Sequence, residues 1–235
     1  MTSHTHSADE HITPVVSEYL QAVYNLGMEG EPAHGAALAR KLGVSRANVS
    51  ATIERMRKLG LVGGAGRGDV ELTEEGLRQA ERALRLHRLA ERYLVDALGL
   101  DWITAHEEAH HFELAITPVL EAAILKQLVN PTTCPHGNPI PGQVPDAANY
   151  LRDLGGLRLS DAEVGSQLEV ICVSEVVEDE TALLRYVGDK GLRPGKQFTI
   201  IERSPDRAAL ELAIEGSRNA VVSAELAAMI WVRAA

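Results

Sequence analysis

Three side chains with metal-binding chemistry recur at helical spacing in the middle of this chain. His106, His110 and Glu113 stand at i, i+4 and i+7, so a helix would carry all three on one face. Imidazole nitrogens together with a carboxylate suit a borderline divalent cation such as Mn(II), Fe(II) or Zn(II). The alternative is that these are ordinary solvated polar residues of an amphipathic helix.

The residues around this trio predict where its helix begins and ends. Thr104 followed by Glu107 has the spacing of a capping box, which predicts a helix start near Ala105. Thr117 precedes Pro118, and a proline favours the first turn of a helix but disfavours helical backbone in the residue before it. The segment therefore predicts two consecutive helices, of which the first carries the ligand candidates.

A second pair of candidates, His87 and Glu91, lies at i and i+4 on a long helix predicted over residues 73–98. Glu74 and Glu75 stand at its start, where the helix dipole favours negative charge. Leucines on more than one side predict burial against its own domain and against a second subunit. A simple surface hydrogen bond is the alternative for this pair.

Residues 34–62 have the pattern of a helix-turn-helix followed by a basic wing. Gly43 suits a left-handed helix end and Ser45 suits an N-cap, and a glycine-rich hairpin over residues 61–72 would form the wing. Residues 36–68 hold seven basic residues and one acidic residue, a local charge of about +6. This charge favours DNA binding over a plain helical hairpin.

The second helix of this motif would enter the major groove of DNA with its first turns. Arg46 and Asn48 can form bidentate contacts with base edges, whereas Ser45, Arg40 and Arg67 are better placed for phosphates. The predicted DNA-contacting residues are Arg40, Ser45, Arg46, Ala47, Asn48, Ser50, Ala51 and Arg67.

Composition limits the class of protein. A chain of 235 residues with 45% hydrophobic residues is ordinary for one to three globular domains, and its net charge of −10 opposes an indiscriminate nucleic-acid binder. The N-terminal residues lack the features of a signal peptide and no apolar run reaches the length of a membrane span. We therefore expect a cytoplasmic protein without a membrane partner.

The C-terminal half of the chain contains a segment rich in proline and glycine, followed by a region of short strand patterns. Residues 131–145 are rich in proline and glycine and predict an ordered connector. Cys134 and His136 within it would be half of a zinc site, but no second pair follows, so the connector is favoured. Two cysteines are also too few for a disulfide framework. From about residue 165, short strand patterns around one helix predict a small antiparallel barrel.

Taken together, these segments resemble the diphtheria toxin repressor family of metal-dependent transcription regulators, whose manganese-responsive branch is the manganese transport regulator. The resemblance covers nearly everything from residue 13 to the end. The sequences that carry it are SEYLQAVYNL, LARKLGVSRANVSATIERMRKLGLV, HRLAERYLVDALGLD, AHEEAHHFE and CPHGNPIPG.

The resemblance implies an α+β protein with three domains. A winged helix-turn-helix DNA-binding domain would occupy residues 1–75, and an all-helical metal-binding and dimerisation domain residues 76–145. A linker at residues 146–164 would lead to a small SH3-like β-barrel, of the ferrous-transport A type, at residues 165–235. The implied partners are a divalent metal, a palindromic double-stranded DNA operator and a second copy of the chain.

The family binds two metal ions, and its ligand positions fall on residues of this chain. The implied ancillary site comprises His87, Glu91 and His106, completed by Glu180 from the SH3-like domain. The implied primary site comprises Glu18, His110 and Glu113. The chain departs from the family pattern at Leu114, where a ligand histidine is usual, and at Leu183, where iron-sensing members have glutamine.

The implied ligands also bear on the identity of the metal. Glu18 and His110 stand where iron-sensing members have methionine and cysteine, and harder ligands favour harder metals. Mn(II) is therefore the first expectation and Fe(II) the alternative, while Zn(II), Co(II), Ni(II) or Cd(II) can occupy such sites in vitro. The resemblance implies a regulator that represses metal-uptake genes and has no enzymatic activity.

Two other functions fit parts of the sequence. Residues 106–110 match the H-E-x-x-H helix of zinc metalloproteases, in which both histidines bind zinc and Glu107 would be the general base. That interpretation leaves the basic helix-turn-helix unexplained. The other alternative is a winged-helix regulator that senses a small organic ligand in a pocket lined by the long helix. It predicts no tight metal binding by chelator-stripped protein.

Overall fold

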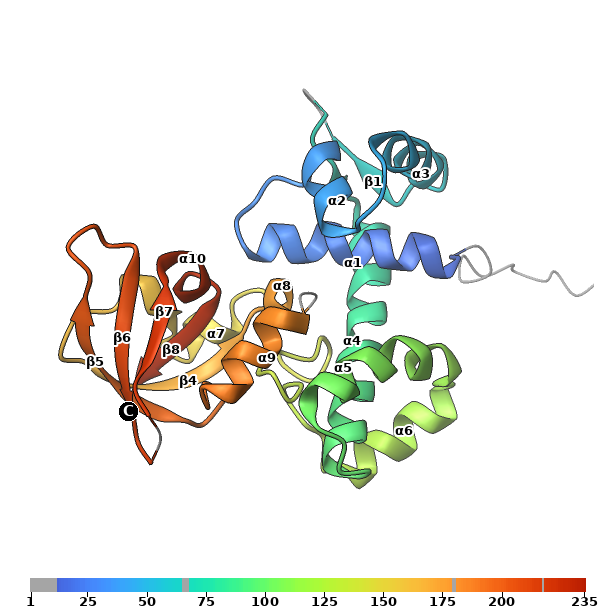
Figure 1. The fold of residues 1–235 in the computed structure, drawn as a ribbon. Coiled ribbons are helices and arrows are strands. Elements are labelled where there is room, and N and C mark those ends of the chain that lie inside the picture. Colours follow the sequence, from blue (N-terminus) through green and yellow to red (C-terminus); the bar gives the residue numbers. More distant parts are fainter. Residues whose placement is uncertain (1–11, 65–67, 179–180, 217) are drawn as a thin grey trace, which may run out of the picture. The chain divides into compact units, whose positions relative to one another are not determined.

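The computed structural model describes residues 12–64, 68–178, 181–216 and 218–235 (Figure 1). The chain divides into two compact units, Met1–Leu84 and Arg85–Ala235, which are described separately. Two predicted site residues, Arg67 and Glu180, lie outside the described residues. Among the described residues, no helix is both long and apolar enough to cross a membrane.

The first unit is a winged helix-turn-helix. It comprises α1 (Pro14–Met28), α2 (Gly35–Lys41), α3 (Arg46–Lys58), the antiparallel strands β1 (Val62–Gly63) and β2 (Glu71–Leu72), and the first turns of α4 (Glu74–Asp96). Ser45 caps α3 by accepting a hydrogen bond from the Asn48 N–H, and Gly43 has a φ of 63° in the turn before it. Both predictions for this turn are confirmed.

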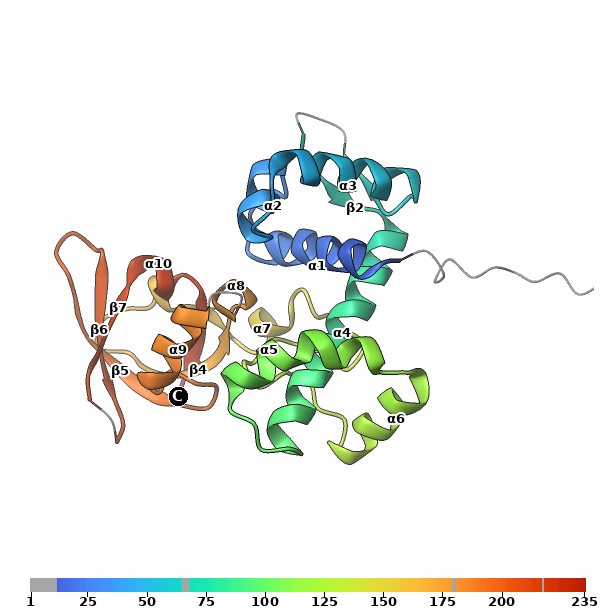
Figure 2. The ribbon, with the colours of Figure 1, turned by 45° about the vertical axis from the view of Figure 1, so that its right-hand side comes forward.

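The core of the first unit leaves one side of α3 to solvent. Leu20, Leu38 and Met56 are fully buried between the helices. Figure 2 shows α3 at the outer edge of this unit, on the side away from α1. The described residues predicted to contact DNA are all exposed, namely Arg40, Ser45, Arg46, Ala47, Asn48, Ser50 and Ala51.

The second unit begins with a helical layer that carries the metal-ligand candidates. Its helices are the rest of α4, α5 (Trp102–Phe112), the 3-10 turn η2 (Glu113–Ala115) and α6 (Pro118–Gln127). α6 begins at Pro118 as predicted, and Thr117 caps it by accepting from the Leu120 N–H. Leu89, Ala105 and Ile124 lie in the core between these helices.

The predicted start of α5 is wrong by three residues. Asp101, and not Thr104, is the N-cap, because its carboxylate accepts from the backbone N–H groups of Ile103 and Thr104 at 3.1 Å. The Thr104 hydroxyl donates to the same carboxylate at 2.6 Å. Glu107 consequently lies inside the helix, where it is exposed.

The rest of the second unit is a six-stranded antiparallel sheet with the strand order β3-β8-β4-β5-β6-β7. Its strands are β3 (Leu157–Arg158), β4 (Gln167–Val173), β5 (Gln197–Arg203), β6 (Ala209–Ile214), β7 (Ala220–Ser223) and β8 (Ile230–Ala234). The short helices are α7 (Tyr150–Asp153), η3 (Leu159–Asp161), α8 (Glu175–Glu178), α9 (Thr181–Asp189) and α10 (Ala224–Ala227). This SH3-like domain contains the strands that the sequence predicts.

The sheet begins inside the segment predicted to be a linker. Leu157 and Arg158 pair with Val232 and Trp231 of β8, and α7 precedes them. Residues 146–164 therefore contain helices and a strand, because their apolar side chains pack into the core of the SH3-like domain. Leu159, for example, is fully buried in its core.

The proline-rich connector packs tightly against β4. The Val173 N–H donates to the His136 carbonyl at 2.8 Å, and the Asn138 side chain donates to the Val173 carbonyl at 2.9 Å. Gly137 has a φ of 94°, and a Cβ there would lie 2.1 Å from the Ile171 carbonyl oxygen. Glycine is required at this position for two reasons, the left-handed backbone and the close approach.

A glycine substitution tests the packing at the start of α4. A Cβ at Gly76 would lie 1.8 Å from the Leu61 carbonyl oxygen, which is backbone and cannot rotate away. We expect Gly76→Ala to lower the free energy of unfolding by about 1–3 kcal/mol in urea titrations. The control is Gly27→Ala in α1, where nothing lies within 4 Å, and it should raise stability by roughly 0.5–1 kcal/mol. Equal effects of the two substitutions would contradict this packing.

Candidate metal centre

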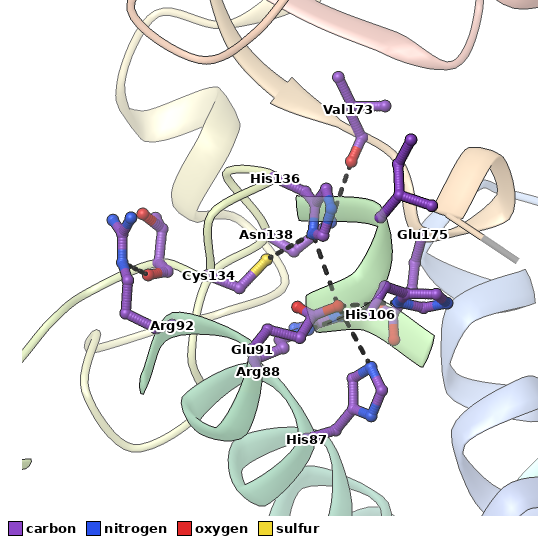
Figure 3. Close-up of polar contacts among 12 residues, drawn as sticks. His87, Arg88, Glu91, Arg92, His106, Cys134, His136, Asn138, Val173 and Glu175 are labelled. Carbon is purple, nitrogen blue, oxygen red and sulfur yellow. Dashed lines mark hydrogen bonds and ion pairs between the residues drawn. The ribbon is translucent and has the colours of Figure 1, made fainter. Parts of the chain in front are cut away.

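A fully buried carboxylate, that of Glu91 on α4, lies at the centre of the candidate site (Figure 3). Its Oε1 atom lies 2.8 Å from Nδ1 of His106, 3.4 Å from Nε2 of His87 and 3.5 Å from Nδ1 of His136. Its Oε2 atom has no hydrogen-bond partner among the described residues. Three imidazoles from different segments therefore converge on one carboxylate.

The electrostatics of this cluster favour positive charge near Glu91. Burial alone would raise the pKa of Glu91, but nearby His136 and His87 and the hydrogen bond from His106 hold that pKa well below its usual value. Burial alone would lower the pKa of His87, but Glu91 and Glu113 outweigh it and raise the pKa well above its usual value. A divalent cation bound beside Glu91 would supply such positive charge.

Three histidines form the first group of ligands within this cluster. The ligand nitrogens of His87, His106 and His110 lie within 4.8 Å of one another, and Nδ1 of His87 lies 2.6 Å from Oε2 of Glu113. His87 comes from α4, the other two histidines from α5, and Glu113 from η2 directly after α5. The helical spacing predicted from the sequence thus brings His106, His110 and Glu113 to the same face, opposite His87.

A second group of candidate ligands includes two residues of the segment that the sequence predicts to be an ordered connector. The ligand atoms of Glu91, Cys134 and His136 also lie within 4.8 Å of one another. The residue next to Cys134 and His136 is Glu91, which stands 43 positions before Cys134 and lies on α4. Only the tertiary fold brings this carboxylate to the connector, so a search for a nearby second pair could not find it.

Sequence reasoning also missed a buried ion pair beside the cluster. Arg88 donates through Nε to the Glu175 carboxylate at 3.2 Å and through Nη1 to the Pro139 carbonyl at 2.6 Å. Burial would raise the pKa of Glu175, but the Arg88 guanidinium holds it below its usual value. Glu175 begins α8 of the SH3-like domain, so it joins that domain to α4. The available signal was Arg88 itself, a charged residue between two ligand candidates on a buried helix.

These donors fit a divalent cation. Imidazole nitrogens and carboxylates are ligands of Mn(II), Fe(II) and Zn(II), and the buried Oε2 atom of Glu91 offers an acceptor for which the described residues provide no hydrogen. Leu114, at the departure from the family pattern, is 63% exposed and offers no ligand atom. Glu18 belongs to the first compact unit, and its role as a ligand stays a prediction from the sequence.

Comparison with known proteins identifies the family. Residues 11–70 match the iron dependent repressor N-terminal DNA binding domain, residues 73–142 the iron dependent repressor metal binding and dimerisation domain, and residues 157–234 the FeoA domain. The iron-dependent repressor IdeR of Mycobacterium leprae is 37% identical over 221 residues, which cover 91% of this chain and 94% of that protein. The chain belongs to the iron-dependent repressor family.

Other members of the iron-dependent repressor family agree with this assignment. The diphtheria toxin repressor of Corynebacterium diphtheriae is 32% identical over 188 residues, covering 79% of this chain and 83% of that protein. A solved structure of a manganese-dependent transcriptional repressor in complex with manganese superposes with a TM-score of 0.80 at 28% identity, covering 94% of this chain and all of the other.

Family membership also bears on the metalloprotease alternative. The part matched by the metal binding and dimerisation domain contains the histidine cluster, and a separate match covers the helix-turn-helix. A metalloprotease would leave that helix-turn-helix without a role, and Glu107, its general base, is exposed in α5. A repressor of this family accounts for both parts of the chain.

The Arg88–Glu175 ion pair provides a stability test. Removal of one member of a buried pair leaves an uncompensated charge, so Glu175→Ala should lower the free energy of unfolding by about 3–5 kcal/mol. The double variant Arg88→Met with Glu175→Leu removes both charges and should recover most of this loss. Urea unfolding of the metal-free protein measures both. Additive losses in the double variant would contradict a direct pairing.

Proton release tests the raised pKa of His87. A metal ligand must be a neutral imidazole, so a cation that binds His87 displaces the proton held there. Because its pKa is raised, Mn(II) affinity should increase as the pH rises through the His87 pKa. Calorimetry near pH 7 in buffers of different ionisation enthalpy should detect release of about one proton per ion. His87→Ala should reduce that number, and proton release unchanged by the substitution would contradict the assignment.

Proposed function

We propose that the chain is a homodimeric repressor that binds a palindromic DNA operator when Mn(II), or alternatively Fe(II), occupies the histidine cluster. The observation that carries this proposal is the cluster of His87, His106 and His110 around the buried Glu91 in a chain that also exposes a recognition helix. The relatives support both metals, since one is named as iron-dependent and another is a manganese complex.

The ligand set supports Mn(II) as the first choice. According to the resemblance, His87, Glu91 and His106 would hold an ancillary ion, and His110 and Glu113 would hold the primary ion together with Glu18. These donors are nitrogen and oxygen, which suit harder cations than sulfur donors do. The bound cation supplies the positive charge that otherwise comes from protons on the imidazoles. The ligands from α4 and α5 would then be held together by the ion, once the imidazoles have lost their protons.

The DNA interface is proposed on α3 and the residues just before it. Arg46 and Asn48 are exposed in the first turn and have donors and acceptors suited to base edges. The Asn48 N–H is occupied by the Ser45 cap, which leaves the amide side chain for bases. Arg40, which pairs at 3.3 Å with Glu31 at an exposed position, is suited to a phosphate.

The resemblance implies that metal and DNA binding are coupled through Glu18. Glu18 belongs to α1, whereas His110 and Glu113 belong to α5 and η2. If these residues share one ion, the DNA-binding unit loses freedom relative to the dimerisation helices. Recognition helices of a dimer must lie about 34 Å apart to enter successive major grooves. A shift from a mostly incompetent to a mostly competent population requires roughly 5 kcal/mol of differential binding.

The ligand assignment predicts the behaviour of a double variant. Glu18→Ala with His110→Ala should retain the dimer but abolish Mn(II)-stimulated binding to the operator in a gel-shift titration. The matched control is His111→Ala, an exposed neighbour of His110, which should keep the full response. Unchanged Mn(II) dependence of the double variant would remove Glu18 and His110 from the mechanism.

Two arginines of the DNA-binding unit should differ in their effects. Arg46→Ala should cost about 1–3 kcal/mol of operator affinity and relax the preference for one base pair, because it removes base contacts. Arg40→Ala should weaken operator and unrelated DNA alike and lower the salt dependence by about one phosphate contact. Fluorescence anisotropy over a range of salt concentrations separates the two. Identical behaviour of both variants would exclude the proposed orientation of α3.

A further inference from the structure

Trp102 belongs to the helix α5, but its side chain lies in the core of the SH3-like domain. It is the first residue of α5, and it is only 4% exposed. Its ring joins the buried cluster that contains Leu184 and Val187 of α9. Ile103, the next residue of α5, packs against the same cluster. A helix that carries metal-ligand candidates thus shares a hydrophobic core with the SH3-like domain.

The close approach of α9 to this indole ring depends on a glycine. Gly188 lies against the ring, and a Cβ there would lie 2.9 Å from Nε1 and 3.2 Å from Cζ2 of Trp102. Arg193, an exposed residue, places its guanidinium carbon 4.8 Å from the ring centroid. Close packing against α9 and this cation–π contact therefore hold the indole in place.

The same ring is connected to the histidine cluster by two routes. Along α5, His106 and His110 stand four and eight residues after Trp102, so the three side chains share one helix face. Through the connector, Trp102 stacks on His136 with the ring centroids 4.9 Å apart. His136 in turn lies edge-on to His106, with the ring centroids 6.0 Å apart (Figure 3). The side chain that enters the SH3-like domain therefore also supports metal-ligand candidates.

We propose that Trp102 is a positioning residue for metal binding. By docking into the SH3-like domain it fixes the first turn of α5, and it thereby sets the affinity of the histidine cluster for Mn(II). This inference rests on the proposed function, in which His106 and His110 bind metal. The indole N–H is a donor and offers no ligand atom, so Trp102 acts through the orientation of α5 and its imidazoles.

The docking gives the SH3-like domain an influence on metal binding that requires no ligand from it. Ala105 and Ala109 are buried in the helical core of the second unit, and Trp102 holds the first turn of the same helix in the SH3-like domain. With both attachments in place, the ligand face of α5 has one orientation. When the docking is weakened, the binding-competent orientation is populated only part of the time, and the apparent affinity falls in proportion.

Gly188→Ala tests the proposal from the SH3-like domain and leaves α5 and every ligand candidate unchanged in sequence. The added Cβ should displace the indole, shift its fluorescence emission to longer wavelength and lower the Mn(II) affinity about tenfold, as loss of support behind a ligand does. Emission and calorimetric Mn(II) affinity are measured on chelator-stripped, full-length Trp231→Phe protein, in which Trp102 is the sole tryptophan. The control is Arg185→Ala, an exposed residue of α9, which should change neither quantity.

A double-mutant cycle separates positioning from a general loss of stability. Because the added Cβ acts through the indole, Gly188→Ala should cause no further loss of Mn(II) affinity in a Trp102→Ala background. Trp102→Phe should recover most of the affinity that Trp102→Ala loses, since it keeps an aromatic ring against His136. Additive losses in the cycle would overturn the proposal, as would an unchanged Mn(II) affinity of Gly188→Ala when its emission shifts.

The same measurements distinguish this inference from the proposed function. A wild type that binds no Mn(II) would remove both. Mn(II) binding by the wild type with an affinity that none of these substitutions changes would remove only the role of Trp102. If circular dichroism shows that Gly188→Ala fails to fold, Trp102→Ala and Trp102→Phe carry the test, and a wild-type affinity in both would contradict the proposal.

Discussion

The interaction on which the second unit depends is that between the buried Glu91 carboxylate and the imidazoles around it. An isolated buried carboxylate is strongly destabilising, so positive charge must accompany it. His87, His106 and His136 come from three different segments, and each can carry either a proton or a share of a metal ion. A structure that requires positive charge at this point and can accept it in either form is suited to sensing a cation.

Three segments of the second unit contribute side chains to the cluster around Glu91. α4 provides Glu91 and His87, α5 provides His106 and His110, and the connector provides His136. Arg88, next to these residues on α4, binds Glu175 of the SH3-like domain. We expect that a metal ion in the cluster would therefore influence the packing of α4 against both α5 and the SH3-like domain.

The sequence predicted features that depend on local chemistry. The turn at Gly43 and Ser45, the helix start at Pro118 and the shared face of His106 and His110 follow from backbone preferences within a few residues, and the structure has them. The start of α5 was misplaced because two caps compete, and Asp101 satisfies two backbone N–H groups while also accepting from Thr104. The spacing of Thr104 and Glu107 fits a capping box, but that spacing does not reveal that the Asp101 carboxylate accepts the hydrogen bonds at the helix start.

Features that depend on distant segments were not predictable in the same way. The pairing of Arg88 with Glu175 joins residues 87 positions apart, and the approach of Glu91 to Cys134 requires the connector to fold back onto α4. The family resemblance supplied His87, Glu91 and His106 as a set, with Glu180 as the carboxylate from the SH3-like domain; Glu180 lies outside the described residues and stays a prediction. Among the described residues, the carboxylate that reaches α4 from that domain is Glu175.

The most direct test of this account is a crystal structure of the protein grown with Mn(II), with anomalous scattering recorded at the manganese edge. The account predicts an anomalous peak bonded to imidazole nitrogens of His87, His106 or His110, next to the carboxylate of Glu91 or Glu113. An operator-competent, manganese-saturated protein with no anomalous peak at this cluster would contradict it.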